Sequence, residues 1–266
     1  MKTVLITGAS SGIGKALALE FGNHGFAVVI TGRDEVKLKE MSSLLTNKNI
    51  EHLWIKADVS VEEDNIKTFT EIQQKYGRLD VLINNAGISM RAMFNECSTE
   101  VIRNLININF MGTVYATKYA LPLILESKGS IVGISSIAGY RGLPARTGYS
   151  ASKFAMQGFL EALRTELLHK GVHVLVACPG FTNSNIRNTA LNAEGNQQGE
   201  SPLEEQKIMS AEEVAVHIYK AVINRKRDLI LTTQGKLTVW VNKLFPNLAD
   251  KLVFNHFKKE KNSPLK

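Results

Sequence analysis

Cysteine is scarce in this sequence. The two cysteines, Cys97 and Cys178, stand far apart and form no CxxC pair, which argues against a framework of disulfides. The six histidines are scattered, none belongs to an HExxH motif, and no histidine cluster lies near either cysteine. We therefore expect no zinc site, and no metal in the functional site.

Long apolar runs are missing as well. No stretch is long enough to cross a bilayer as a helix. The opening MKTVLITG combines a lysine with a short apolar run, but Gly8 follows too soon for the apolar core of a signal peptide. We interpret this opening as a first strand and expect a cytoplasmic protein.

The excess of basic residues is moderate. Lysine and arginine number 32 against 25 acidic residues, a net charge of +7 on 266 residues. This balance permits an anionic partner, but the sequence has no zinc finger, no basic-region zipper and no aromatic-rich RNA-binding strand. We favour a solvated basic surface with a basic tail and expect no nucleic-acid partner.

What the sequence does contain is an alternation of short β-branched runs and helical patterns. Most runs are almost continuously apolar, as in strands that are buried on both faces of a parallel sheet. The expected strands are 4–7, 27–31, 52–57, 81–85, 130–135, 173–178 and 228–231. The expected helices are 12–23, 35–46, 61–76, 99–126, 150–169 and 211–225. This order predicts an α/β protein with a doubly wound parallel sheet.

Two segments depart from the alternation. Residues 182–210 are polar and rich in Gly, Asn and Gln, and a loop of that length is typical of a lid or of a disordered stretch. Residues 235–266 mix Trp, Phe, Leu and Val with lysines, and Pro246 divides them. We expect one domain over 1–234, with 182–210 as a substrate lid, and a basic amphipathic C-terminal tail over 235–266.

The first expected strand leads into TGASSGIG, residues 7–14, and an amphipathic helix follows at once. Gly8 permits a tight turn, Gly12 lets the backbone approach a pyrophosphate, and Gly14 lets the helix lie close to the sheet. The helix N-terminus then offers free N–H groups to phosphates. The GxxxGxG spacing alone also fits an ordinary glycine-rich turn, but its place between the first strand and the first helix favours dinucleotide binding.

The end of the second expected strand bears on which dinucleotide is bound. Units that bind NAD place an acid there to hold the ribose 2′-hydroxyl, whereas this sequence has Gly32 and Arg33. An arginine suits a 2′-phosphate through a charge-assisted contact, so we expect NADP (NADPH). A solvated loop arginine is the plainer alternative. Asp34 is expected to start the next helix as its N-cap.

Two more motifs fall at the carboxyl ends of strands, where ligands of such sheets bind. In ADVS, Asp58 is placed to accept a hydrogen bond from the adenine amino group, with Val59 beside the ring. In NNAG, the small residues of 84–87 leave room for a cofactor over the sheet edge.

The pentapeptide YSASK suggests the chemistry. Tyr149 and Lys153 stand four residues apart and therefore project from one face of a helix. A nearby ammonium favours the phenolate and lowers the tyrosine pKa, which suits proton transfer to a carbonyl oxygen. Ser136 follows the fifth strand and is placed to donate to the same oxygen, whereas Ser135 should point the other way. Asn109 is a plausible fourth member; each residue alone also has an ordinary structural explanation.

Taken together, these motifs resemble those of the classical short-chain dehydrogenase/reductase family. The matching motifs are TGASSGIG, ADVS, NNAG, Asn109 in its N-x-x-G setting, SS at 135–136, YSASK and PG at 179–180. They follow the family's order over about residues 1–184. The resemblance implies a single Rossmann-type domain with a seven-stranded parallel sheet and helices on both faces.

The resemblance also implies roles for the residues. Tyr149 would be the catalytic acid/base, and Lys153 would lower its pKa and bind the nicotinamide ribose. Ser136 would polarise the substrate carbonyl, and Asn109 would hold a water behind Lys153. The implied cofactor-binding residues are Gly8, Ser10, Ser11, Gly12, Ile13, Gly14, Arg33, Asp58, Val59, Asn85, Ala86, Gly87, Tyr149, Lys153, Pro179, Gly180 and Thr182.

Some departures from the family pattern matter. NADP-binding members often carry a basic residue where this chain has Ser11, so the expectation of NADP rests on Arg33. Ser184 stands where many members have a threonine. The stretches NNAGISMRAMF and CPGFTNSNIR look like those of membrane-linked dehydrogenase/reductase proteins and steroid dehydrogenases. They suggest a bulky apolar substrate and a pocket drawn from Met90, Met93, Phe94, Tyr140, Leu143, Phe181 and Ile186. For any single one of these residues, ordinary core packing is the favoured explanation.

The expected reaction is therefore reversible hydride transfer between NADP(H) and a small-molecule ketone or secondary alcohol. A non-catalytic dinucleotide-binding sensor or scaffold is the alternative. The family resemblance implies a homodimer or homotetramer through the helices around 103–126 and 149–169. For the tail from 235, we favour packing against the domain or a partner subunit over contact with a membrane surface.

Overall fold

The first strand shows how the apolar runs build the core. All of β1 (Thr3–Thr7) is buried, and its side chains alternate between two faces. Val4 and Ile6 join the apolar core on one face of the sheet, and Leu5 joins the core on the other. A strand buried on both sides needs helices on both sides, and the rest of the chain supplies them.

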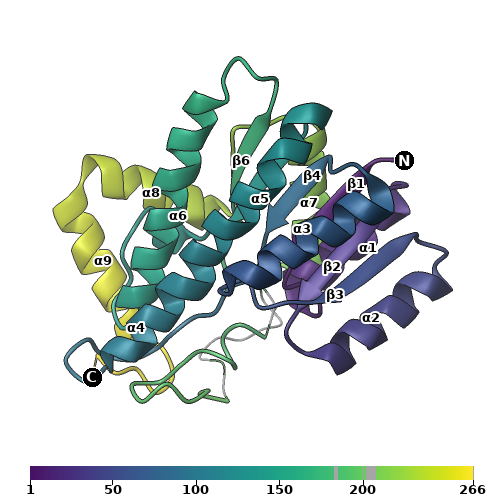
Figure 1. Cartoon of the computed structure of the whole chain (residues 1–266). Helices are drawn as coiled ribbons and strands as arrows, with labels where there is room; N and C mark the ends of the chain where they lie inside the picture. The colour runs from purple at the N-terminus through teal and green to yellow at the C-terminus, as the bar shows by residue number, and fades with distance from the viewer. Residues whose placement is uncertain (183–184, 200, 202–207, 266) are drawn as a thin grey trace.

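In the computed structural model, which describes residues 1–182, 185–199, 201 and 208–265, the strands form one parallel sheet (Figure 1). The sheet has seven strands in the order β3-β2-β1-β4-β5-β6-β7. The strands after β1 are β2 (Ala27–Gly32), β3 (His52–Lys56), β4 (Val81–Asn84), β5 (Ser130–Ile134), β6 (His173–Cys178) and β7 (Asp228–Ile230). The predicted α/β class, the doubly wound topology and all the predicted strands are confirmed.

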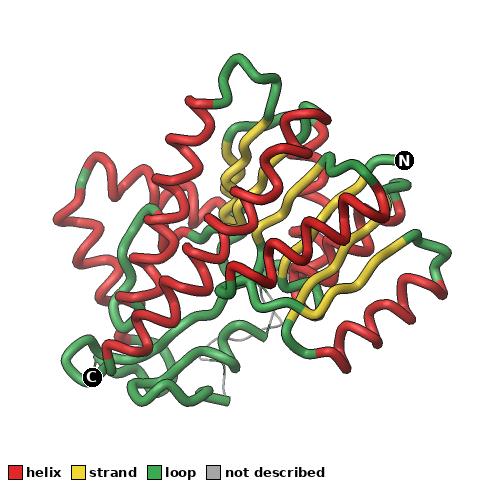
Figure 2. The backbone as a smooth tube through the Cα atoms, viewed as in Figure 1, coloured by secondary structure: helices red, strands yellow, loops and turns green. Residues whose placement is uncertain are grey.

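Helices cover both faces of this sheet. The core on one face is built with α1 (Gly12–Asn23), α2 (Glu35–Asn47) and α7 (Ala211–Ile223). The core on the other face is built with α3 (Glu62–Tyr76), α5 (Gly112–Ser127) and α6 (Thr147–Glu166), which lie in front of the sheet in Figure 1. The strand order reverses between β1 and β4, which are hydrogen-bonded neighbours. In Figure 2 the longest loops gather at the lower end of the sheet.

The predicted helix over 99–126 is wrong in one detail, because it is not one regular helix. α4 (Thr99–Leu105) passes into a π-helical segment, η1 (Ile106–Met111), before α5 begins. Such wide turns occur mostly at functional sites, and this one contains Asn109. Apolar periodicity does not distinguish one π turn from a continuous α-helix, so the interruption was not predictable from the pattern.

The C-terminal segment forms two helices. Pro246 opens α9 (Pro246–Lys258), directly after α8 (Thr233–Leu244), because proline fits the first turn of a helix. The inner side of the pair packs on the domain, where Ala249 and Phe257 are buried. The outer side exposes the large apolar residues Leu237, Trp240, Leu244, Phe245, Leu248, Leu252 and Phe254. No helix in the described ranges is long and apolar enough to cross a membrane.

Candidate functional site

The turn between β1 and α1 has the geometry of a phosphate cradle. Gly8 and Gly12 both adopt the left-handed backbone region, with φ of 65° and 52°, which side chains disfavour. A Cβ on Gly14 would lie 2.4 Å from the carbonyl oxygen of Gly8, so the close approach requires glycine. Ser11 caps α1 without a side-chain hydrogen bond, and no acidic residue occupies the first helical turn. The helix end therefore offers unsatisfied N–H groups and a positive dipole end to an anion.

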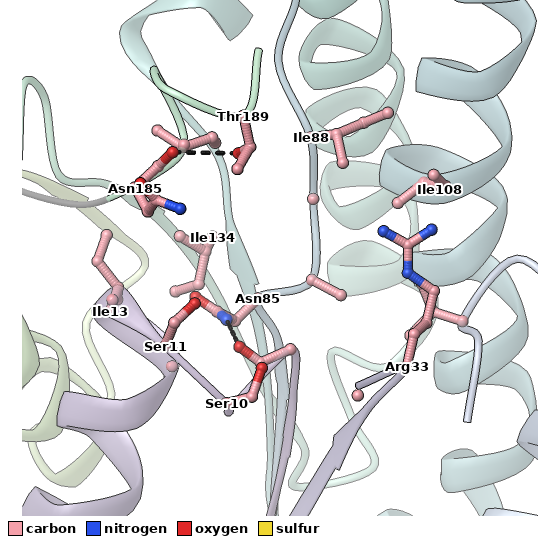
Figure 3. A pocket seen from close by; sticks show the side chains of 18 of the residues that line it. Ser10, Ser11, Ile13, Arg33, Asn85, Ile88, Ile108, Ile134, Asn185 and Thr189 are labelled. Carbon is pink, nitrogen blue, oxygen red and sulfur yellow. Dashed lines mark hydrogen bonds between the residues drawn. The ribbon is translucent and has the colours of Figure 1, made fainter. Parts of the chain in front are cut away.

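Side chains from two neighbouring strands hold this turn. The Thr7 hydroxyl oxygen accepts hydrogen bonds from the backbone N–H groups of Asn85 and Ala86, both at 3.0 Å. The Asn85 amide in turn donates to the carbonyls of Thr7 at 2.8 Å and Gly8 at 3.1 Å. Figure 3 shows Asn85 beside Ser10 and Ser11 at one end of the cleft. The NNAG motif thus positions the glycine turn as well as leaving room above the sheet.

Two cations stand at the end of β2. The Arg33 side chain is 63% exposed and lies 3.8 Å from an oxygen of Asp58. Asp34 caps α2 as predicted, because its carboxylate accepts from the backbone N–H of Lys37 at 3.1 Å. That hydrogen bond lowers the Asp34 pKa, so the carboxylate is engaged at the helix end. Lys37 also lines the cleft, although no motif in the sequence singled it out.

Ser136, Tyr149 and Lys153 meet in the same cleft. Tyr149 lies in the first turn of α6, and Lys153 follows one turn later. The Lys153 ammonium nitrogen is 5.8 Å from the centre of the Tyr149 ring and donates to the carbonyl of Ile134 at 2.9 Å. The Ser136 hydroxyl accepts from the backbone N–H of Ala138 at 3.1 Å and lies close enough to Tyr149 to act on its pKa. Ser135 accepts from Gln157 at 2.8 Å and also lines the cleft, so its expected opposite orientation stays a prediction.

The predicted direction of the Tyr149 pKa is wrong for this structure. Burial raises the Tyr149 pKa, and this outweighs the lowering by the Ser136 hydroxyl and by the charges of Arg146 and Arg187. Burial lowers the Lys153 pKa from 10.5 to about 8. Tyr149 therefore holds its proton at neutral pH.

Asn109 lies behind the cleft and positions the residues around it. Its side chain accepts from the backbone N–H of Ile88 at 2.8 Å and donates to the carbonyl of Ile88 at 3.0 Å. It also donates to the Ser152 hydroxyl at 2.9 Å, and Ser152 donates to the carbonyl of Tyr149 at 2.8 Å. These contacts connect the π-helical segment η1 to α6, which carries Tyr149 and Lys153. The water relay implied by the family resemblance remains a prediction.

All predicted cofactor-binding residues line one cleft of about 1010 Å³. Sequence reasoning did not assign other residues that line it, which include Lys37, Ser60, Ile88, Asn104, Asn107, Ile108, Ile134, Asn185, Arg187, Thr189, Leu191, Gly195 and Gln197. Ser152 was also missed, although it stands inside YSASK. The hydroxyl of Thr189 donates to the carbonyl of Asn185 at 3.1 Å, at the top of Figure 3. Described parts of the predicted lid therefore form a wall of the cleft, while Ser184 lies outside the described residues.

The residues expected to form an apolar substrate pocket are dispersed. Ile186 lines the cleft, and Leu143 and Phe181 line a second cavity beside it. Met90 is instead fully buried in a small apolar cluster, and Phe94 is 65% exposed. Within the described part of the chain, no group of three His, Cys, Asp or Glu side chains is placed to hold a metal ion.

The doubly wound sheet and the phosphate cradle define a dinucleotide-binding protein. Comparisons with known proteins identify the family. A family model described as short chain dehydrogenase matches residues 2–195. The mouse protein named dehydrogenase/reductase SDR family member 7B is 35% identical over 266 residues, which cover 98% of this chain and 82% of that protein. An Arabidopsis thaliana protein named 11-beta-hydroxysteroid dehydrogenase-like 4A is 34% identical. The match covers 93% of this chain and 82% of that protein.

Solved structures agree on the fold. A short chain dehydrogenase/reductase from Burkholderia phymatum in complex with NAD has a TM-score of 0.83 and 23% identity, covering 93% of this chain and 94% of its own. An alcohol dehydrogenase from Thermococcus sibiricus complexed with 5-hydroxy-NADP has a TM-score of 0.76 and 22% identity. The match covers 87% of this chain and 96% of that chain. The chain belongs to the short-chain dehydrogenase/reductase family, whose members are oxidoreductases with a fold that binds a nicotinamide dinucleotide.

Proposed function

We propose that the protein transfers hydride reversibly between NADP(H) and a ketone or secondary alcohol with a bulky apolar body, with Tyr149 as the acid/base. The observation that carries this proposal is the meeting of Ser136, Tyr149 and Lys153 in the cleft that also contains the phosphate cradle. The name of the Arabidopsis relative supports a bulky apolar substrate. A homodimer or homotetramer remains part of the proposal.

The residues present fit the dinucleotide. Backbone N–H groups at the start of α1, together with the Ser10 and Ser11 hydroxyls, would hold its phosphates. The dinucleotide, when bound, supplies the hydride chemistry. The protein supplies the proton, which the protonated Tyr149 hydroxyl donates to the carbonyl oxygen of a ketone. Ser136 donates a second hydrogen bond to that oxygen, and Lys153 places positive charge near it.

Arg33 and Lys37 support a preference for NADP. Both line the cleft at the end of β2, where an enzyme that prefers NAD would present a free carboxylate. The one carboxylate in the loop, Asp34, already caps α2 and lies 3.5 Å from the Lys37 ammonium. Arg33 is therefore the group best placed to bind a 2′-phosphate.

Calorimetric titration with NADPH and NADH tests the cofactor preference. We expect Arg33→Ala to weaken NADPH binding by about ten- to a hundredfold, since a charge-assisted hydrogen bond contributes about 1.5–3 kcal/mol. NADH binding should change little. Arg227→Ala is the matched control, because its side chain is 64% exposed and lies next to the start of β7, at the other end of the sheet. Equal affinities of the wild type for NADPH and NADH would contradict the preference.

The alternative of a non-catalytic sensor predicts cofactor binding without turnover. The Tyr149 hydroxyl separates the two functions, because it matters to proton transfer but not to phosphate binding. A Tyr149→Phe variant that keeps full biological activity would favour the sensor.

A further inference from the structure

A second cavity of about 330 Å³ lies against the first. Ser136 and Gly180 line both the cofactor cleft and this cavity, so the two spaces meet at the serine that shares the cleft with Tyr149. A ligand whose carbonyl lies at Ser136 therefore has two directions in which its body can extend. One leads along the cleft toward the phosphate cradle, and the other leads into the second cavity.

The C-terminal helix pair forms the far wall of the cavity. Val241 from α8 and Val253 and Phe257 from α9 line it, facing Ile137 and Phe181 from the catalytic side. The family model ends at residue 195, so this wall belongs to the part of the chain that the model does not cover. The wall therefore lies outside the part of the chain that the family model matches.

The lining of the cavity suits an uncharged ligand. Its described lining residues include no Lys, Arg, Asp or Glu, and His256 is the only titratable group among them. Two of the hydroxyls that line the cavity already form hydrogen bonds with the backbone of α8. The Thr232 hydroxyl accepts from the backbone N–H of Gly235 at 3.0 Å, and the Thr238 hydroxyl donates to the carbonyl of Gln234 at 2.8 Å. Burying apolar surface is therefore the main interaction that the cavity offers.

The cavity reaches the surface between the two helices. Leu237 and Leu252 line it, although 58% and 52% of them remain exposed, so they form an apolar rim. The helix pair that carries this rim is held to the catalytic side of the domain. The Arg141 guanidinium bonds the side chains of Asn242 and Asp250, and the Asn242 amide donates to the carbonyl of Tyr140 at 3.0 Å.

We propose that this cavity binds the apolar body of the substrate, an aliphatic chain or fused-ring system, while the reacting carbonyl lies at Ser136. The inference rests on the proposed function, because it assigns the substrate class of the same site. The helices α8 and α9 then select substrates by size and apolar character, and a ligand too long for the cavity extends outward between Leu237 and Leu252.

Two fluorescent ketones test the proposal without turnover. Prodan and laurdan share one naphthalene ketone, but laurdan carries a dodecanoyl chain where prodan has propanoyl, and both emit at shorter wavelength in apolar surroundings. We expect the NADP⁺-loaded protein to bind laurdan at least tenfold more tightly than prodan, with blue-shifted emission. Equal affinity for the two ketones would overturn the proposal.

Substitutions locate the binding. Val241→Trp fills the cavity, and Leu252→Asp places a charge at its rim without disturbing the buried core. Each should weaken laurdan binding at least tenfold and leave NADPH affinity unchanged. The matched controls are Leu244→Trp and Leu248→Asp, at residues that are 51% and 49% exposed and do not line the cavity. If Val241→Trp does not fold, Leu252→Asp still tests whether laurdan binds in the cavity. A Leu252→Asp protein that binds laurdan with wild-type affinity would contradict the proposal.

The outcome also separates this inference from the proposed function. If the protein oxidises NADPH with small ketones but laurdan does not enter the cavity, the inference fails alone. If laurdan binds as expected and no ketone supports NADPH oxidation, the cavity stands as an apolar binding site and the proposed catalysis fails.

Discussion

Lys153 carries an amine in surroundings that disfavour its charge. The side chain is 3% exposed, and its ammonium donates to the carbonyl of Ile134. Burial lowers its pKa from 10.5 to about 8. The amine is expected to act in catalysis, although its burial lowers the stability of the folded protein. Measuring that loss of stability tests whether the site is maintained at the expense of folding. Lys153→Met keeps the volume and removes the amine.

The sign and size of the expected stability change follow from the Lys153 pKa in the folded chain and in the unfolded chain. Below pH 8 the folded and the unfolded chain both hold the proton, and the folded state bears a cost of about 3 kcal/mol at about 1.4 kcal/mol per pH unit. Between pH 8 and 10.5 only the unfolded chain keeps the proton, so the stability of the wild type rises with pH in that window. Lys153→Met escapes the cost but loses a hydrogen bond of about 1 kcal/mol. The variant should be about 2 kcal/mol more stable near pH 7, and this advantage should vanish near pH 10.

Urea unfolding of both proteins from about pH 7 to pH 10 measures this difference. Burial also raises the pKa of Tyr149, Tyr140 and Cys178, which removes stability from both proteins as the pH rises through the values of the unfolded chain. These effects largely cancel in the difference. Lys170→Met, at an exposed position, is the control. A Lys153→Met variant that is less stable near pH 7, or a difference that does not vary with pH, would refute the reasoning.

Two more substitutions test the framework around the site. Gly14→Ala should cost about 1–3 kcal/mol and abolish measurable NADPH binding, because its Cβ meets the carbonyl of Gly8 at 2.4 Å. Gly158→Ala in α6, where a Cβ meets nothing within 4 Å, should instead stabilise by about 1 kcal/mol, and urea unfolding compares the two. Glu260→Ala should cost about 3–5 kcal/mol, since its buried carboxylate binds Arg146 at 2.9 Å and lies 3.5 Å from Arg91. Without it, neither guanidinium keeps this buried carboxylate as a counter-charge. The exposed Glu161→Ala, which breaks a surface pair with Arg227, should cost less than about 1 kcal/mol; equal losses for the two glutamates would contradict the account.

The sequence predicted best what local patterns determine. Strands buried on both faces appear as apolar runs, and each predicted strand end lies within one residue of the observed one. Left-handed turns favour glycine, so the places of Gly8 and Gly12 between the first strand and the first helix were enough to indicate the cradle. The Asp34 cap was predicted for the same kind of reason, because capping depends on the residues that immediately follow.

Features that depend on burial or on distant partners were not predictable. The Tyr149 pKa rises because tertiary packing removes water from the phenol, and the spacing within YSASK does not encode that burial. Asn109 finds its partner in the backbone of Ile88, on a segment 21 residues away. The apolar cavity needs α8 and α9 folded back beside Ser136, which the mixed pattern of 235–266 does not reveal.

Proton donation by Tyr149 to a ketone is the central claim, and steady-state oxidation of NADPH tests it most directly. The assay compares the wild type, Tyr149→Phe and Tyr219→Phe, a control in α7 on the other face of the sheet, with a series of alkyl ketones as substrates. We predict that Tyr149→Phe lowers kcat by about a hundredfold or more and leaves the NADPH affinity unchanged, while Tyr219→Phe turns over like the wild type. A Tyr149→Phe protein that reduces these ketones at the wild-type rate would contradict the claim.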